Sequence, residues 1–411
     1  MGTSALTNNR FTAALRSKEK SGDAPLLITV IILVAFGLLM LYSSSVDYSV
    51  EILGKEPGYM LRRQFLWLLI GIAAAYILSR LDYHYWRHLA VYVMAGTVIA
   101  LIAVLLISEL RLGAVRTVYN GSIQPSELGK LVTVIYLAVW LYAKRAQLHN
   151  IELGLIPLAL ILGLIGGLIY LQPDLSATAT VFLLGGTLFF LAGADIKQLT
   201  ILMVLAVLVA WIVIQFSEKG QSRVEFYWLG LKDPMNASYH VKRALEAIVN
   251  GGVFGLGIGK SLTKLTGLPV PPTDSIFAVV TEEFGVVGAT FLISLYGVLV
   301  WRSLVIARRA PDMLGTLLAT GLAFWIGIEA LINMTVMVGL LPVAGNALPF
   351  ISAGGSSLVT SLAAIGIIYN VSRQYGVGAS QAEDEWRAFG ATTDLRGRNG
   401  RRSLSRTRRS R

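Results

Sequence analysis

The sequence predicts an all-α, polytopic membrane protein with about ten transmembrane helices and one large extracytoplasmic loop. Hydrophobic residues make up 55% of the 411-residue chain and charged residues only 14%, against roughly 25% charged residues in a soluble domain. Apolar runs long enough to cross about 30 Å of hydrocarbon recur along the whole chain. The runs are continuous and lack the alternation of barrel strands, so helices are expected to satisfy the backbone within the membrane.

The ten expected spans define a transmembrane domain over residues 26–372, between an N-terminal tail at 1–25 and a basic tail at 373–411. One connection is long, at about 217–275, and its apolar and aromatic residues predict one or two short helices lying on the membrane surface. The spans cover about 26–46, 65–81, 89–108, 126–143, 155–171, 176–193, 198–216, 276–301, 312–335 and 355–371.

Basic residues predict the orientation of the spans. They gather in the N-terminal tail and in the short loops that follow the even-numbered spans, which indicates that these loops and both termini are cytoplasmic. Arg62 and Arg63 fall on the outer side and run against the pattern. The first span has no clear cleavage site after it and is expected to be retained. The loop residues are Arg87, Lys144, Arg145, Lys197, Arg302, Arg308 and Arg309.

The net charge of +11 is concentrated in the C-terminal "RGRNGRRSLSRTRRSR". Its polar composition without apolar periodicity is typical of a disordered segment. Binding to nucleic acid is one use for such a tail, but anchoring to anionic lipid at the cytoplasmic surface is simpler, and no nucleic-acid partner is expected. The chain has no cysteine, which excludes disulfides, thiolate metal ligands and thiol nucleophiles.

Four features put polar groups at the outer ends of spans. "SIQPSELGKL" opens the fourth span with Glu127 and Lys130, three residues apart and therefore on one helix face. Ionisable residues in a membrane segment indicate function, although a structural ion pair is the alternative. "YLQPDLSATAT" places Asp174 after Pro173, where capping of a helix N-terminus is the favoured interpretation.

The third and fourth features are the segments that precede the eighth and tenth spans. In "GLPVPPTDSIFAVVTEEFG", Asp274 follows two prolines and directly precedes an apolar run, so it is either a helix cap or a functional carboxylate. "LPVAGNALPFISAGGSSL" predicts irregular backbone that protein must cover, with Ser356 and Ser357 opening the last helix. Their convergence at one level predicts a site at the outer membrane surface.

A glycine-rich stretch in the long loop, "GLGIGKS", superficially suggests a phosphate-binding loop. The first glycine that this motif requires is replaced by Phe254, and neither a preceding strand nor a soluble domain is expected. A flexible glycine-rich turn that presents Lys260 near the outer surface is the preferred interpretation.

Together "QPSELGK", "QPDL", "LPVPPTDSIFAVVTEEFGVVG" and "INMTVMVGLLPVAGNALPFISAGGSSL" resemble the SEDS family of bacterial cell-wall proteins, which includes FtsW and RodA, over about residues 26–372. The resemblance implies a ten-helix glycosyltransferase of the inverting type that polymerises lipid II outside the cytoplasmic membrane. It also implies a class B penicillin-binding protein as partner. "GGSS" and the long basic tail favour the FtsW branch, hence cell division at the septum, over the RodA branch.

Residue roles follow from the same resemblance. Asp274 matches the essential aspartate of the family, Glu127 and Lys130 match its "QPSElaK" pair, and Arg116 matches the second arginine of "GARRW". The last motif reads "GAVRT" here, so one arginine and the tryptophan are absent. Pro272 stands in place of a family histidine and Ala353 in place of a tyrosine, and these departures concern accessory contacts and not the core of the match.

The implied chemistry needs a base for a sugar hydroxyl and cations for a departing lipid pyrophosphate. Asp274 is the candidate base. Two other functions stay open, a translocase that moves lipid II across the membrane without forming a bond and a purely structural scaffold. A divalent cation, Mg or Mn, is possible, and no other cofactor is expected. The candidate substrate-binding residues are Glu127, Lys130, Arg116, Lys260, Lys264, Lys242, Arg243 and Ser356.

Overall fold

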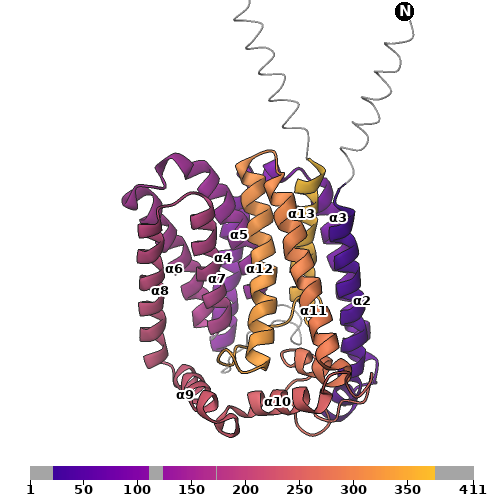
Figure 1. Cartoon of the computed structure of the whole chain (residues 1–411). Helices are drawn as coiled ribbons and strands as arrows, with labels where there is room; N and C mark the ends of the chain where they lie inside the picture. The colour runs from indigo at the N-terminus through magenta and orange to yellow at the C-terminus, as the bar shows by residue number, and fades with distance from the viewer. Residues whose placement is uncertain (1–21, 111–123, 173, 375–411) are drawn as a thin grey trace, which may run out of the picture.

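The computed structural model describes residues 22–110, 124–172 and 174–374, which form a bundle of upright helices with two further helices lying across one end (Figure 1). Within this part, nine helices are long and apolar enough to cross a membrane, and the apolar helix α7 is shorter at 17 residues. The prediction of about ten spans is therefore confirmed. The upright helices are α2 (Ala24–Asp47), α3 (Tyr59–Arg80), α4 (Trp86–Leu110), α5 (Pro125–Lys144), α6 (Ile156–Leu171), α7 (Leu175–Leu191), α8 (Ile196–Gln215), α11 (Ile276–Arg308), α12 (Met313–Met337) and α13 (Gly355–Arg373).

The described chain begins and ends at the same end of the bundle (Figure 1). Asp23 caps α2 by accepting a hydrogen bond from the Leu26 N–H at 2.9 Å, and its own N–H donates to Ser372 Oγ at 3.1 Å. Arg302, near the end of α11, pairs with the Asp23 carboxylate. An even number of crossings, as the sequence predicted, is the topology that brings these residues together.

The middle of the bundle is formed by α5, α12 and α13, and α8 stands at its edge (Figure 1). Between 67% and 78% of the most apolar stretch of each of the three central helices is buried, against 11% for α8. Glycine allows the closest approach between α3 and α13, because a Cβ on Gly366 would lie 2.5 Å from the Ala75 carbonyl oxygen.

The long connection between α8 and α11 contains two helices, α9 (Glu218–Lys232) and α10 (Tyr239–Gly251), as the sequence predicted. Both begin at a serine whose side chain caps the helix: Ser217 accepts from the Gly220 N–H and Ser238 from the Val241 N–H. The two helices lie across the end of the bundle opposite to Asp23 (Figure 1). Together they cover the ends of the membrane helices.

Helix α11 is broken at Gly285, which the expectation of one uninterrupted span did not foresee. Gly285 has a φ of 66°, a left-handed conformation that favours glycine. The glycine-rich stretch, taken here as residues 251–260, packs its backbone directly against the break. A Cβ on Gly285 would lie 2.3 Å from the Val253 carbonyl oxygen. The stretch is therefore fixed against α11 and is not the flexible turn that the sequence suggested.

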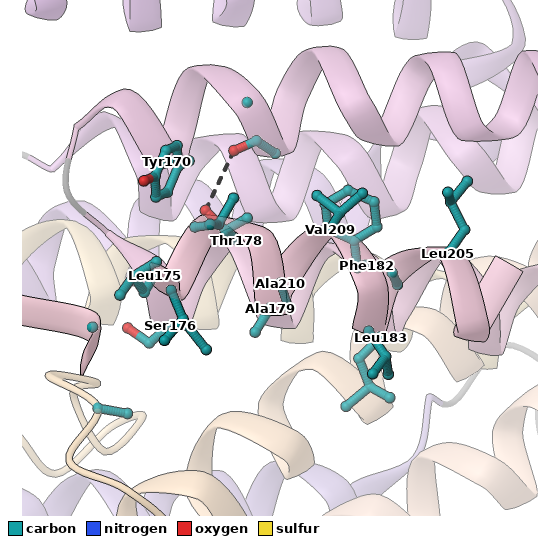
Figure 2. Close-up of a pocket in the computed structure, with 18 of the residues that line it drawn as sticks. Tyr170, Leu175, Ser176, Thr178, Ala179, Phe182, Leu183, Leu205, Val209 and Ala210 are labelled. Carbon is teal, nitrogen blue, oxygen red and sulfur yellow. Dashed lines mark hydrogen bonds between the residues drawn. The ribbon is translucent and has the colours of Figure 1, made fainter. Parts of the chain in front are cut away.

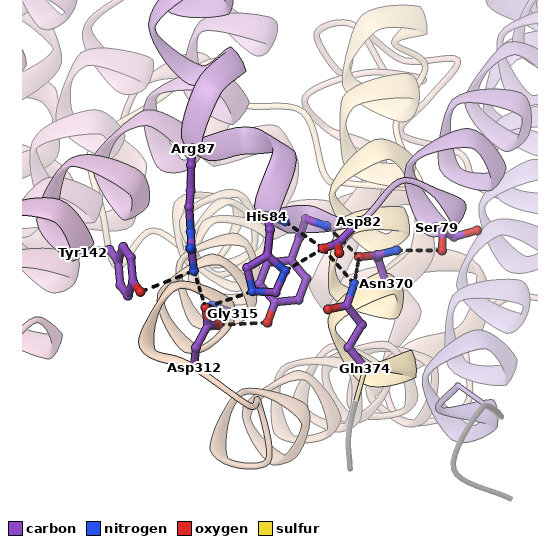
Figure 3. A network of polar contacts seen from close by, with 10 residues as sticks. Ser79, Asp82, His84, Arg87, Tyr142, Asp312, Gly315, Asn370 and Gln374 are labelled. Carbon is purple, nitrogen blue, oxygen red and sulfur yellow. Dashed lines mark hydrogen bonds and ion pairs between the residues drawn. The ribbon is translucent and has the colours of Figure 1, made fainter. Parts of the chain in front are cut away.

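A polar network joins the helices at the end of the bundle away from α9 and α10, where α3 and α13 end and α4 and α12 begin (Figure 3). Asp312 pairs with Arg87 at 2.9 Å, accepts from the Tyr83 hydroxyl at 2.9 Å and caps α12 through the Gly315 N–H at 2.9 Å. The His84 ring lies between two carboxylates. Its Nε2 is 3.2 Å from Asp312 and its Nδ1 is 2.6 Å from Asp82, in the turn after α3. The contacts of Asp312 with Tyr83, His84 and Arg87 join segments more than 200 residues apart in the sequence.

Candidate functional site

Asp274 lies in the turn that leads into α11, and the backbone around it is held by the other side of the bundle. Three consecutive carbonyls accept hydrogen bonds: that of Pro272 from the Ala353 N–H at 2.8 Å, that of Thr273 from Ser352 Oγ at 2.6 Å, and that of Asp274 from Asn333 Nδ2 at 2.9 Å. The position of the half-buried Asp274 is thus set by α12 and by the segment before α13.

The sequence left open that Asp274 is the N-cap of the helix that follows it. In the structure the N-cap position is the next residue. Ser275 occupies the N-cap position of α11, with no capping hydrogen bond from its side chain. Its hydroxyl donates to the Pro269 carbonyl at 2.5 Å, and it lies 2.6 Å from His240 Nε2. Burial lowers the pKa of His240, which favours a neutral ring that donates from Nε2 to Ser275.

The connection between α12 and α13 closes over the carboxylate. A Cβ on Gly345 would lie 3.2 Å from Asp274 Oδ2, so the carboxylate faces this connection. Phe350 on it has a φ of 67°, and Val270, just before the Asp274 turn, has a φ of 43°. Positive φ at residues other than glycine is uncommon and at valine an outlier, and such strain is concentrated at functional sites.

The connection is irregular and covered by protein, as the sequence predicted. Leu348, Phe350, Ile351 and Ser352 are all buried. Gln64 of α3 donates to the Ser352 carbonyl at 3.2 Å, so a helix from the other side of the bundle also holds it.

Glu127 and Lys130 belong to a buried group of three charges. Lys130 Nζ lies 2.8 Å from Glu127 Oε1 and also donates to Glu329 of α12. The Lys130 side chain is 3% exposed and that of Glu329 is 2% exposed. This burial favours a structural role over direct substrate contact. The sequence analysis missed Glu329, although an acid inside "WIGIEALINM" carries the signal of an intramembrane charge.

Asp174 is a helix cap, as predicted. It accepts from the Ala177 N–H at 3.1 Å and thereby caps α7. Gln124, just before α5, donates to Asp174 through its side chain at 3.0 Å and to Ser356 Oγ through its backbone N–H at 3.1 Å. The starts of α5, α7 and α13 therefore meet, and the expected gathering of the polar features at one end of the bundle is confirmed.

The basic candidates in the connection between α8 and α11 differ in how many hydrogen bonds and ion pairs their side chains make with the protein. Lys264 is buried, donates to the Ser43 carbonyl at 3.0 Å and lies 3.5 Å from Glu283. Arg243 donates to the Thr266 carbonyl at 2.8 Å and pairs with Glu246 at 2.6 Å.

Lys242 and Lys260, in the same connection, make fewer side-chain contacts with the protein. Lys242 donates to the Met235 carbonyl at 3.1 Å. The exposed Lys260 has no side-chain hydrogen bond or ion pair with the described residues. Arg116 lies outside the described residues.

The described part of the chain contains no cluster of side chains arranged to bind a metal ion. Among residues 22–110, 124–172 and 174–374, no group of three or more His, Asp or Glu side chains is arranged to hold an ion.

An apolar cavity of about 690 Å³ lies between α6, α7 and α8 and reaches α9 (Figure 2). Thr178 and Tyr170 are among its few polar lining residues, and the Thr178 hydroxyl donates to the Gly166 carbonyl at 3.3 Å. Ala344 lines the cavity, and the next residue, Gly345, faces the Asp274 carboxylate. The cavity therefore ends beside the site.

Fold and site together define a polytopic helical membrane protein with an acidic site at one membrane surface, bordered by an apolar cavity. The family model described as "Cell cycle protein" (FtsW/RodA/SpoVE) matches residues 24–376. The chain belongs to this family, as the sequence motifs indicated.

Curated relatives agree over most of their length. The chain is 35% identical over 370 residues to "Stage V sporulation protein E" of Bacillus subtilis (strain 168), covering 87% of this chain and 99% of the relative. It is 35% identical over 357 residues to a "Probable peptidoglycan glycosyltransferase FtsW" of Trichlorobacter lovleyi, covering 85% and 93%. These names favour the FtsW side of the family over RodA.

Solved structures share the fold. A chain described under "Structural coordination of polymerization and crosslinking by a peptidoglycan synthase complex" aligns with a TM-score of 0.68 at 26% identity, covering 87% of this chain and 99% of that one. The rod shape determining protein RodA of Thermus thermophilus aligns with a TM-score of 0.60 at 27% identity, covering 87% and 98%.

Proposed function

We propose that this protein is a peptidoglycan glycosyltransferase that polymerises lipid II at the membrane surface covered by α9 and α10. The observation that carries the proposal is the junction of Asp274 with the apolar cavity, through Ala344 and Gly345. A lipid-linked sugar needs both an apolar space for its prenyl chain and a polar reacting centre at the membrane surface. The names of the FtsW relatives support the same activity.

In the proposed reaction, the oxygen of a sugar hydroxyl on one lipid-linked unit attacks the anomeric carbon of another. The bond between that carbon and the pyrophosphate oxygen breaks, and its electron pair leaves with the lipid pyrophosphate. Asp274 accepts the hydroxyl proton as general base. Attack from the face opposite to the leaving group inverts the anomeric centre. The backbone contacts around Asp274 keep the base in place, which reduces the entropy lost on reaching the transition state.

Positive charge near the site would stabilise the leaving pyrophosphate. Lys260 and Lys242 fit this role better than Lys264, because Lys264 is buried beside Glu283. We propose Arg116 as a further contact on the family motif alone. A divalent cation would bind mainly through the pyrophosphate oxygens, and no step above depends on it.

The proposed setting is the bacterial cytoplasmic membrane with both termini in the cytoplasm. The basic loop residues favour this orientation, which makes the α9–α10 surface the outer one. A class B penicillin-binding protein is the proposed partner, supported by the solved synthase complex that joins polymerization and crosslinking. The FtsW names favour the division septum.

Purified protein in liposomes with labelled lipid II tests the activity. A polymerase produces glycan chains, which a gel resolves by length, whereas a translocase only changes the leaflet in which the label is found. We expect glycan, with a higher yield when the partner penicillin-binding protein is co-reconstituted. Leaflet exchange without glycan, in the presence of every candidate partner, would instead support the translocase, for which the apolar cavity between α6, α7 and α8 is also suited.

A further inference from the structure

The glycine-rich stretch completes the broken helix α11. The N–H groups of Leu256 and Gly257 donate to the carbonyls of Glu282 and Glu283, each at 3.0 Å, on one side of the break. On the other side, the N–H groups of Val286 and Val287 donate to the carbonyls of Gly252 and Val253, at 3.0 and 3.2 Å. These four bonds satisfy backbone groups that the break at Gly285 exposes.

A second set of contacts fixes the far side of the stretch. The fully buried Glu282 carboxylate accepts from the hydroxyls of Ser261 and Thr263 and from the Leu262 N–H at 3.2 Å. Glu283 accepts from Ser43 Oγ of α2 at 2.5 Å. Hydrogen bonds therefore hold the stretch to α11 both through its own backbone and through the residues that follow it. The side chains that point away from the bundle are kept in that direction.

Those side chains are large and apolar. Phe254 is 84% exposed, and Val253 and Ile258 are each more than half exposed. They continue a strip of exposed apolar residues on the neighbouring part of α11, namely Val286, Val287 and Phe291. That strip belongs to a helix long and apolar enough to cross a membrane, so its exposed face is suited to contact with lipid.

The length of α11 gives the depth of the stretch. Trp301 and Arg302 near its far end are the residue types that mark a membrane interface. Val286, the first residue after the break, precedes Arg302 by 16 residues, which at about 1.5 Å per residue is about 24 Å, most of the roughly 30 Å thickness of the hydrocarbon layer. The stretch, which is bonded to residues 282–287, therefore lies at the opposite boundary of the hydrocarbon.

We propose that residues 251–260, the glycine wedge, insert into the lipid leaflet at the α9–α10 end. Val253, Phe254 and Ile258 enter the acyl chains, and Lys260 reaches the level of the lipid phosphates, as long basic side chains do at an interface. The wedge holds the first part of α11 at the membrane surface. The insertion of Val253, Phe254 and Ile258 does not depend on the enzymatic activity, whereas Lys260 at this level could also contact the pyrophosphate of the proposed substrate.

Because the chain contains no cysteine, a single labelled cysteine can test the wedge directly. Phe254→Cys is labelled with an environment-sensitive NBD dye, and the full-length protein is placed in nanodiscs. Quenching by spin-labelled lipid is compared with quenching by aqueous iodide. Lys232→Cys, at the exposed end of α9, serves as the aqueous reference and Phe291→Cys of α11 as the lipid reference.

We expect the dye at position 254 to resemble the one at Phe291, with lipid quenching several-fold stronger than iodide quenching. Iodide quenching equal to that at Lys232, with no lipid quenching, would overturn the wedge and indicate a surface for a protein partner. If the Phe254 variant does not elute as a folded protein, Ile258→Cys gives the same comparison.

Discussion

The two ends of the helix bundle hold their acidic residues in opposite ways. At the end where α2 begins and α13 ends, the Asp312 carboxylate itself binds Arg87, Tyr83 and the Gly315 N–H (Figure 3). At the α9–α10 end, Asp274 is fastened through its main chain, by Asn333 and by the segment before α13. The Asp312 carboxylate binds neighbouring elements of the fold, whereas neighbouring elements bind the main chain of Asp274, and the proposed general base lies at the second end.

The same chemical change at both ends gives the largest contrast. Asp274→Asn keeps the size of the side chain but removes a base, so we expect polymerisation to fall by roughly 10²–10⁴ with normal thermal stability. Glycan yield from lipid II and a melting curve in detergent measure the two quantities. Near wild-type glycan synthesis would leave Asp274 without a role as general base.

Asp312→Asn is the matched control at the other end. It retains the ability to cap α12 but weakens the partly exposed ion pair with Arg87, at a cost of roughly 0.2–1 kcal/mol. We expect a slightly lower melting temperature and unchanged polymerisation. A large loss of activity would show that the two ends are coupled and that the comparison fails.

The buried charges beside α12 are expected to be important for stability. Lys130→Ala leaves Glu127 and Glu329 buried without their cation, which costs roughly 3–5 kcal/mol. We expect poor accumulation in membranes, partly restored when Glu127 and Glu329 are also changed to Gln. A well-folded Lys130→Ala protein that makes little glycan would instead point to a substrate contact.

The break in α11 can be tested with two glycines of the same helix. In Gly285→Ala the new Cβ meets the Val253 carbonyl at 2.3 Å and the residue must keep a positive φ, which costs on the order of 1–3 kcal/mol. A Cβ on Gly297 would have no described atom within 4 Å, so Gly297→Ala is expected to be neutral or slightly stabilising. Equal melting temperatures for the two variants would contradict the packing described here.

The smallest expected effect is a difference in pH response between the ends. Burial lowers the pKa of His240, so the unfolded chain binds its proton first, and stability falls as pH drops below about 6.5. Burial acts to raise the pKa of Asp82, but hydrogen bonds from Gln374 and His84 outweigh it and the pKa is lowered. Its contribution is therefore lost only in stronger acid, below about pH 4.

Melting curves between pH 7.5 and 5.5 should show a decline that His240→Gln reduces. The same decline in the variant would assign the effect to another group.

Sequence patterns predicted the features that depend on neighbouring residues. Asp174 could be assigned as a cap because Pro173 and the following helix are adjacent to it, and the spans follow from apolar length alone. Glu329 beside Lys130, the glycine stretch against Gly285 and the burial of Lys264 were missed. Each depends on residues far apart in the chain, about which a local pattern carries no information.

The position of α13 has a consequence for how the protein is made. It is the last of the described helices in chain order, yet 78% of its most apolar stretch is buried, mainly against α3, which is made early. Until α13 has left the ribosome, the surface of α3 around Ala75 lacks the helix that packs closely against it. Packing of the core therefore cannot finish before α13 is made, and the incomplete bundle exposes surface that favours misassembly.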